Sequence, residues 1–296
     1  MKKKFQGTGV ALVTPFHKNG NIDFSSIERI VEHTIKNGVN YIVVLGTTGE
    51  APTLSKDEKN AVSAFVIDTI NGRVPVVKGI GGNNTQEVVN CIKTESFDGV
   101  DAILSVCPYY NKPQQKGIYY HYKTIASVSS VPVILYNVPG RSGANIDAET
   151  TLQLAHNFKN IIAVKEASGD FTQVMKILNN KPDDFMVISG DDAFTLPLMA
   201  LGVQGVISVV ANAFPAEFSR LVNLCLEGKF EAAKLLHFQM IDIITTLFED
   251  GSPGGIKAAL NILELCENNL RLPVVKVNKS INLQLNNLIS EFLSKK

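Results

Sequence analysis

A lysine ends one of the most apolar runs in the sequence. Lys165 follows the run 161–164, and strand alternation places it on the same face as Ile161 and Ala163. If that face is buried, loss of hydration favours the neutral amine, which attacks carbonyl groups and can form a Schiff base. A lysine that only pairs with a carboxylate, or that extends into solvent at the rim, would end an apolar run in the same way. Other residues must therefore decide between a reactive lysine and a structural one.

Hydroxyl groups follow two other apolar runs. Tyr136 ends the run 131–136, and Thr47 and Thr48 follow the run 41–45. Taken singly, Tyr136 is typical of an ordinary strand aromatic, and the threonines are typical of a turn. Beside a reactive lysine, however, hydroxyls can move protons while a carbinolamine forms and dehydrates. Their combination with Lys165 favours Schiff-base chemistry on a small carbonyl substrate.

The remaining polar motifs favour chemistry without a metal or a bound cofactor. Arg141 lies in a loop rich in glycine and serine, where its guanidinium could bind a carboxylate, although a single loop arginine is usually solvated. Asp191 and Asp192 could bind a divalent cation, but adjacent acids before a helix more often cap it. The histidines lack zinc-ligand spacing, and the glycine-rich segment 79–84 satisfies neither nucleotide-binding motif.

The elements that must position these residues alternate between short strands and helices. Each β-branched run is followed by a segment with helical apolar spacing, which predicts βαβ units and a parallel sheet. Eight strands are expected, at 10–13, 41–45, 74–78, 101–106, 131–136, 161–165, 185–189 and 206–210. Eight units of about 30 residues indicate a closed (β/α)₈ barrel rather than an open sheet of five or six strands. The active site is then expected at the carboxyl ends of the strands.

Helix signals complete this fold. The segment 55–58 forms a capping box, and Thr85 and Asp147 are N-cap candidates. After the last strand only helical segments follow, at about 230–248, 255–265 and 280–293, with Pro215 near the start of another. No flexible linker separates them, so we expect a catalytic barrel at 1–214 and a helical extension at 215–296 packed on it.

The composition excludes several classes of partner. The chain has 28 Lys and Arg residues against 28 Asp and Glu residues, so no net charge attracts nucleic acid or an anionic membrane. No apolar run reaches the length of a membrane span, and the N-terminal segment lacks the apolar core of a signal peptide. The four cysteines are scattered, without metal or disulfide spacing. A cytoplasmic enzyme acting on small molecules is expected.

Seven motifs resemble those of the 4-hydroxy-tetrahydrodipicolinate synthase family, formerly called dihydrodipicolinate synthases. They are GVALVTPF at 9–16, GTTGE at 46–50, PYYNKP at 108–113, YNVPGRSG at 136–143, VKEASG at 164–169, GDD at 190–192 and GVISVVAN at 205–212. The N-acetylneuraminate lyases and keto-deoxy-sugar aldolases are similar to the synthases in the sequence around the Schiff-base lysine. The paired threonines, paired tyrosines and the arginine favour the synthase over these aldolases, and the intact lysine and tyrosine argue against a regulator that only binds a small acid.

The resemblance implies a role for each residue. Lys165 would form the Schiff base with pyruvate, whose enamine then attacks aspartate 4-semialdehyde. The proton relay would consist of Thr48, Tyr136 and Tyr110, with Tyr110 supplied by a neighbouring subunit of a homotetramer built as a dimer of dimers. Substrates would be held by Thr47 and Ile207 at the pyruvate portion and by Arg141 at the semialdehyde carboxylate.

The resemblance also implies an effector pocket for lysine. Members that lysine inhibits carry a serine and one or two histidines in the segment 51–59, where this chain has Ala51, Lys56 and Lys59. Three other residues, Asn83, Glu87 and Tyr109, resemble the pocket's remaining ligands. Two additional cations would repel the ammonium groups of lysine, so we expect weak or absent inhibition.

Overall fold

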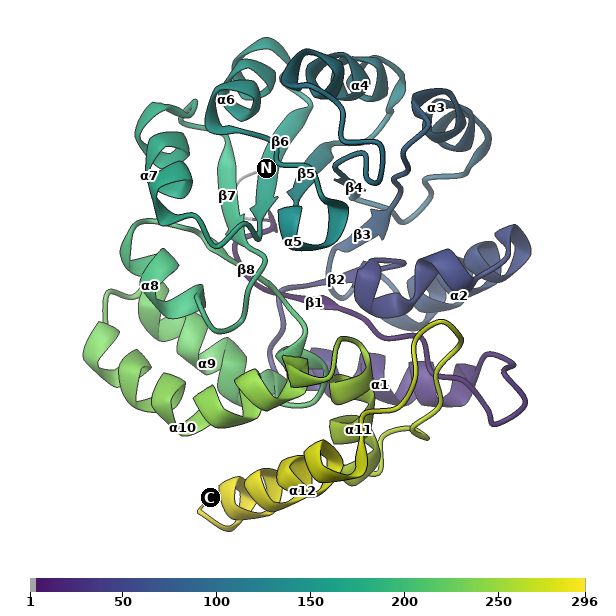
Figure 1. Ribbon diagram of the computed structural model, residues 1–296, viewed down its shortest axis with the longest axis vertical. Coiled ribbons are helices and arrows are strands. Elements are labelled where there is room, and N and C mark those ends of the chain that lie inside the picture. Colours follow the sequence, from purple (N-terminus) through teal and green to yellow (C-terminus); the bar gives the residue numbers. More distant parts are fainter. Residues whose placement is uncertain (1–3, 296) are drawn as a thin grey trace.

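The predicted barrel is confirmed. The computed structural model describes residues 4–295, and its eight parallel strands pair in sequence order, with β8 closing on β1 (Figure 1). The strands are β1 (Gly7–Ala11), β2 (Tyr41–Val44), β3 (Val76–Gly79), β4 (Ala102–Val106), β5 (Val133–Asn137), β6 (Ile161–Glu166), β7 (Met186–Ser189) and β8 (Gly205–Ser208). The first strand begins three residues earlier than the apolar run because Gly7, Thr8 and Gly9 pair with β8.

Helices surround the strands on the outside of the barrel, apart from the short helix α5, which lies over the end of the barrel (Figure 1). They are α1 (Phe24–Lys36), α2 (Lys56–Ile70), α3 (Thr85–Thr94), α4 (Gln115–Val128), α5 (Pro139–Ser142), α6 (Ala148–Asn157), α7 (Phe171–Asn180) and α8 (Thr195–Ala200). Ser55 and Glu58 form the expected capping box of α2, and the side chain of Asp147 caps α6. The N-cap of α3 is Asn84 rather than Thr85, because the Asn84 side chain accepts the Gln86 amide at 3.0 Å.

Four helices follow β8. They are α9 (Pro215–Leu226), α10 (Phe230–Glu249), α11 (Gly254–Ile262) and α12 (Lys279–Ser294). Helix α9 contacts β1 and α8, whereas α10, α11 and α12 contact one another (Figure 1). The apolar residues of this segment join those of β1, β2, α1 and α2 in one buried cluster. The extension therefore packs on the barrel through a continuous hydrophobic core.

The strand that carries Lys165 contains an irregularity. Val133 of β5 pairs with Ile161, but the next residue, Ile134, pairs with Ala163, so one residue of β6 is unmatched. Ile161 consequently packs in the outer cluster, whereas Ala163 packs inside the barrel. The expectation that Ile161 shares a face with Lys165 is wrong, because this bulge interrupts the alternation of side chains.

Candidate active site

Lys165 and Tyr136 meet at the carboxyl ends of neighbouring strands. The two residues are paired in register between β6 and β5, and the Lys165 Nζ atom lies 4.3 Å from the centre of the Tyr136 ring. Both are buried, with 5% and 6% of their surfaces exposed. Tyr136 packs in the cluster inside the barrel, together with Ile188, the partner of Lys165 on β7. The amine therefore lies in a largely dry environment at the mouth of the barrel.

Gly190 leaves space for the Lys165 side chain. It follows β7, and a Cβ atom placed on it would lie 3.1 Å from Cε of Lys165 and 2.7 Å from Cβ of Ala167. Its backbone amide also donates to the carbonyl oxygen of Glu166, at 2.8 Å. The absence of a side chain at Gly190 thus allows the close approach of β7 to the lysine.

A second lysine ends a similar apolar run but has different surroundings. Lys78 follows Val77 on β3, yet Val77 is the residue that packs inside the barrel. Lys78 pairs in register with Ile103, whose side chain packs outside, and its ammonium forms an ion pair with Glu95 after α3. The pattern of an apolar run and a terminal lysine therefore occurs twice, and the strand register and the ion pair with Glu95 distinguish the two amines.

A cavity of about 520 Å³ opens beside Tyr136 at the same end of the barrel. Thr47 and Arg141 line it together with Tyr136, so three of the predicted site residues are brought together. Thr47 belongs to a single 3₁₀ turn after β2, and Arg141 lies in α5 after β5. Both side chains are exposed toward solvent. The cavity can therefore admit a small acid, with a guanidinium available for its carboxylate.

Thr48 and Ile207 lie deeper. Thr48 is 4% exposed in the turn after β2, and Ile207 is 1% exposed in the cluster inside the barrel. Neither is among the described residues that line the cavity, and neither is Lys165, which adjoins it through the Tyr136 ring.

Tyr110 has a different position from the other predicted residues. It is 87% exposed and has a left-handed backbone, with φ of 76°. Its amide donates to the Ser142 carbonyl at 3.3 Å, next to Arg141. Such a conformation is uncommon for a bulky residue and is maintained by surrounding contacts. The loop places Tyr110 near the cavity rim, with its side chain unburied in the single chain.

The residues of the predicted effector pocket line the same cavity, with one exception. Ala51, Lys59, Asn83, Glu87 and Tyr109 are among the lining residues. The Asn83 side chain also donates to the Tyr109 carbonyl at 3.3 Å. Lys56, in the first turn of α2, is exposed and is not among the lining residues that the structure describes.

A buried carboxylate outside the barrel supports the end of β6. Glu166 is 2% exposed and accepts hydrogen bonds from the Asn137 side chain at 3.0 Å and from the Ser168 amide at 2.7 Å. Gln173 of α7 donates to the same carboxylate at 3.1 Å. The motifs of the sequence do not predict this cluster, and its one local signal is a glutamate directly after Lys165 in an apolar strand. Through these hydrogen bonds, the Glu166 carboxylate connects β5, β6 and α7 next to Lys165.

The acidic pair after β7 has a structural role. Asp191 accepts hydrogen bonds from the backbone amides of Ala193 and Phe194 in the turn before α8. The expectation that these acids cap the helix is wrong, because its N-cap residue is Phe194 and no side chain caps it. Asp192 is buried and accepts from the amides of Val209 and Val210, and burial raises its pKa to about 6. Among residues 4–295, no group of three or more His, Cys, Asp or Glu side chains is arranged to hold a metal ion. No helix in this range is long and apolar enough to cross a membrane.

Comparison with known proteins gives matches over almost the entire chain. The model of the dihydrodipicolinate synthetase family matches residues 4–292. A 4-hydroxy-tetrahydrodipicolinate synthase of Parabacteroides distasonis is 53% identical over 270 residues, which cover 91% of each chain. The crystal structure of a dihydrodipicolinate synthase from Thermotoga maritima has a TM-score of 0.95 and 39% identity, and covers 98% of this chain and 99% of that one. The crystal structure of a chloride-inhibited dihydrodipicolinate synthase from Acinetobacter baumannii, complexed with pyruvate, has a TM-score of 0.94 and 38% identity. The match covers 97% of this chain and 98% of that one.

Proposed function

Because the chain belongs to the dihydrodipicolinate synthetase family, we propose that it condenses pyruvate with L-aspartate 4-semialdehyde to give 4-hydroxy-tetrahydrodipicolinate. This lyase reaction belongs to diaminopimelate and lysine biosynthesis. The observation that carries the proposal is the burial of the Lys165 amine against Tyr136 at the mouth of the barrel. A buried amine beside a phenol is suited to a Schiff-base mechanism that requires no further cofactor.

The reaction begins with addition of the Lys165 amine to the 2-oxo carbon of pyruvate. The carbinolamine loses water to give an iminium, and loss of a methyl proton gives the enamine. Tyr136, whose ring centre lies 4.3 Å from the amine nitrogen, exchanges these protons together with Thr48. Thr47 and Ile207 hold the pyruvate portion.

The second substrate enters through the open cavity. The enamine carbon attacks the aldehyde carbon, forming the new carbon–carbon bond, and the aldehyde oxygen is protonated. The amino group of the semialdehyde then attacks the imine carbon, which closes the ring and releases Lys165. One water is released overall. Arg141 binds the carboxylate of the semialdehyde at the cavity rim, where its guanidinium is exposed.

Completion of the relay requires a second copy of the chain. Tyr110 from a neighbouring subunit completes the relay of Thr48 and Tyr136, within a homotetramer built as a dimer of dimers. The exposure of the Tyr110 side chain in its left-handed loop supports this assignment. An exposed aromatic that is held in a strained backbone indicates a contact made outside the single chain. We also propose that the enzyme acts in the cytoplasm.

Intact-mass analysis after addition of pyruvate and borohydride tests this proposal. One reduced pyruvyl group per chain is expected, and peptide mapping should place it on Lys165. Lys78 provides an internal control, because it ends a similar run and lines the cavity but is paired with Glu95. The Lys165→Ala variant should remain folded and unlabelled. Absence of an adduct on the folded wild type, or labelling of Lys78 instead, would contradict the mechanism.

The second substrate is tested separately. The enzyme should consume pyruvate only when aspartate 4-semialdehyde is present, and it should not cleave N-acetylneuraminate or keto-deoxy sugar acids. Labelling of Lys165 combined with cleavage of such a sugar acid would retain the Schiff base but replace the synthase with an aldolase.

A further inference from the structure

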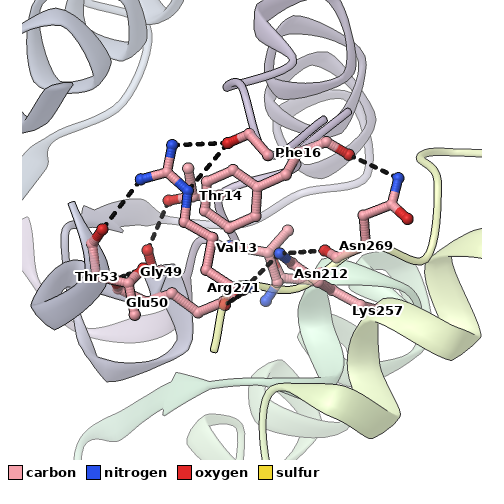
Figure 2. Close-up of polar contacts among 11 residues, drawn as sticks. Val13, Thr14, Phe16, Gly49, Glu50, Thr53, Asn212, Lys257, Asn269 and Arg271 are labelled. Atoms are coloured by element: carbon pink, nitrogen blue, oxygen red, sulfur yellow. Dashed lines mark hydrogen bonds and ion pairs between the residues drawn. The ribbon is translucent and has the colours of Figure 1, made fainter. Parts of the chain in front are cut away.

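A buried ion pair connects the C-terminal extension to the turn that carries Thr47 and Thr48. Lys257 of α11 contacts Glu50, and their side chains are 0% and 1% exposed (Figure 2). Lys257 also donates to the Asn269 carbonyl at 2.9 Å, and its Nζ lies 4.2 Å from the centre of the Phe16 ring. Removing two charges from water is unfavourable unless both are well paired, so this contact has a specific geometry.

Glu50 is directly attached to the turn of the two threonines. The turn Thr47–Gly49 ends at Glu50, whose amide donates to the Thr47 carbonyl at 3.1 Å. Glu50 has a left-handed backbone, with φ of 52°, and Leu45 on the other side of the turn has φ of 60°. Non-glycine residues adopt this conformation only where neighbouring contacts impose it. The position of the turn therefore depends on the contacts of the Glu50 side chain.

The second carboxylate oxygen of Glu50 also contacts the extension. It accepts the Arg271 backbone amide at 3.0 Å (Figure 2). The Arg271 guanidinium donates to the Thr53 carbonyl at 3.0 Å and to both oxygens of Glu58, at 2.8 and 2.5 Å. Both oxygens of Glu50 are thus bound by residues that follow the barrel by more than 40 positions.

Burial lowers the pKa of Lys257, and the Glu50 carboxylate opposes this effect by attraction and hydrogen bonding. The Glu50 carboxylate therefore favours the charged form of Lys257. A carboxylate so deep in the protein has no access to water as an alternative partner.

We infer that Glu50, held by Lys257 and by the Arg271 backbone, is a positioning residue that places Thr47 and Thr48 at the mouth of the barrel. This inference rests on the proposed function, because it assigns the threonines to the pyruvate site and the proton relay. The extension then contributes to catalysis without supplying a residue to the cavity. A displacement of about 1 Å in such a turn can slow a reaction about 100-fold.

The double variant Glu50→Gln/Lys257→Met tests this role. It removes both buried charges together, so the fold should survive where either single change would leave one charge unpaired. We expect the rate at which pyruvate labels Lys165, measured per folded chain by borohydride quenching at successive times, to fall about tenfold or more. The final fraction of labelled chains should stay near that of the wild type. A role in stability alone would lower that fraction and the Tm but not the rate per folded chain.

Arg29→Met is the matched control. Arg29 of α1 donates to the carbonyls of Leu265 at 3.0 Å and Glu264 at 3.4 Å, so its loss removes a contact with the extension that does not involve the turn. This variant should label as fast as the wild type. If the double variant does not fold, Arg271→Met replaces it in the test, because the Arg271 side chain is partly exposed. This variant should also label Lys165 more slowly than the wild type does.

The outcomes separate the two proposals. Suppose that pyruvate labels Lys165 in the wild type. If the double variant is then labelled as fast as the wild type, or if Arg29→Met is labelled as slowly as the double variant, the positioning role is overturned and the function stays intact. A wild type that forms no adduct would overturn the function and the positioning role with it.

Discussion

The Lys165 Nζ atom lies 4.3 Å from the centre of the Tyr136 ring, and the two residues are paired in register between β6 and β5. Their proximity is therefore imposed by the backbone of the barrel rather than by a mobile loop. A face-on ring shields the amine from water and attracts its cationic form, while the phenol at the edge of the ring remains available for proton transfer. In the proposed mechanism, Tyr136 thus provides both the environment of the nucleophile and a route for its protons.

Tyr136→Phe separates these two functions. The ring and its packing remain, but the hydroxyl is lost, so we expect kcat to fall about 100-fold or more while the Tm changes by only a few degrees. Steady-state kinetics with a thermal unfolding control will measure both. Lys165 should still be labelled by pyruvate and borohydride, at a lower rate. Wild-type kcat in a folded Tyr136→Phe enzyme would remove Tyr136 from the proton relay.

Gly190→Ala should impair the nucleophile without changing any polar group. The added methyl group would lie 3.1 Å from Lys165 Cε and 2.7 Å from Ala167 Cβ, so the lysine must move. We expect labelling of Lys165 to slow about tenfold, since the amine would no longer be aligned with the substrate carbonyl. Gly140→Ala is the matched control, because no atom lies within 4 Å of the corresponding Cβ position. Equal labelling rates in both variants would show that the fit at Gly190 is unimportant.

The sequence predicts the barrel well because its pattern is local and repeated. Eight apolar runs each lead into an amphipathic segment, and all eight form strands in the closed sheet. The bulge in β6 was missed because the run at 161–164 is apolar on both faces, so the alternation has no polar residue to mark an irregularity. The division of the chain at residue 215 remains a prediction.

The site was only partly predictable, because its key relationships involve distant parts of the chain. Lys165 and Lys78 end similar runs, and their different surroundings depend on register and on Glu95 beyond the next helix. Glu50 and Lys257 are separated by 207 positions, and nothing local to either residue indicates that they meet. Such pairs arise from tertiary packing, which periodicity and spacing do not encode.

The cavity lining separates the two lysines of the predicted effector pocket. Lys59 lines the cavity with Glu87 and Tyr109, whereas Lys56 is exposed elsewhere on α2. We expect lysine to inhibit the wild type weakly, and Lys59→Gln to strengthen inhibition by about threefold or more, because a cation facing the ammonium groups is removed. Lys56→Gln is the control and should leave inhibition unchanged. Initial rates across a lysine titration will test this, and strong inhibition of the wild type would contradict the prediction.

His121 is expected to make the fold sensitive to acid. It is 3% exposed, and burial lowers its pKa from 6.5 to about 4. Its Nδ1 atom lies 2.9 Å from the Thr85 hydroxyl, and its Nε2 atom is buried without a hydrogen-bond partner. A positive charge at this position would therefore be poorly solvated.

The sign of the effect follows from proton binding. Between pH 6.5 and 4 the unfolded chain binds a proton at His121 that the folded chain does not, so the free energy of unfolding falls as the pH is lowered through this window. The loss approaches about 3 kcal/mol near pH 4. Asp192 acts in the opposite direction below pH 6, because its raised pKa makes the folded state bind the additional proton. Comparison of His121→Gln with the wild type isolates His121, since Asp192 is present in both.

Denaturant unfolding of His121→Gln and the wild type between pH 4.5 and 7.5 will measure this effect. The variant should lose less stability than the wild type as the pH falls below about 6.5, although it can be less stable than the wild type at pH 7.5 through lost packing. His156→Gln is the control, because His156 is exposed and its loss should leave the pH dependence of the wild type unchanged. Parallel curves for His121→Gln and the wild type over the whole range would show that the His121 ring gains its proton equally well in the folded and unfolded chains.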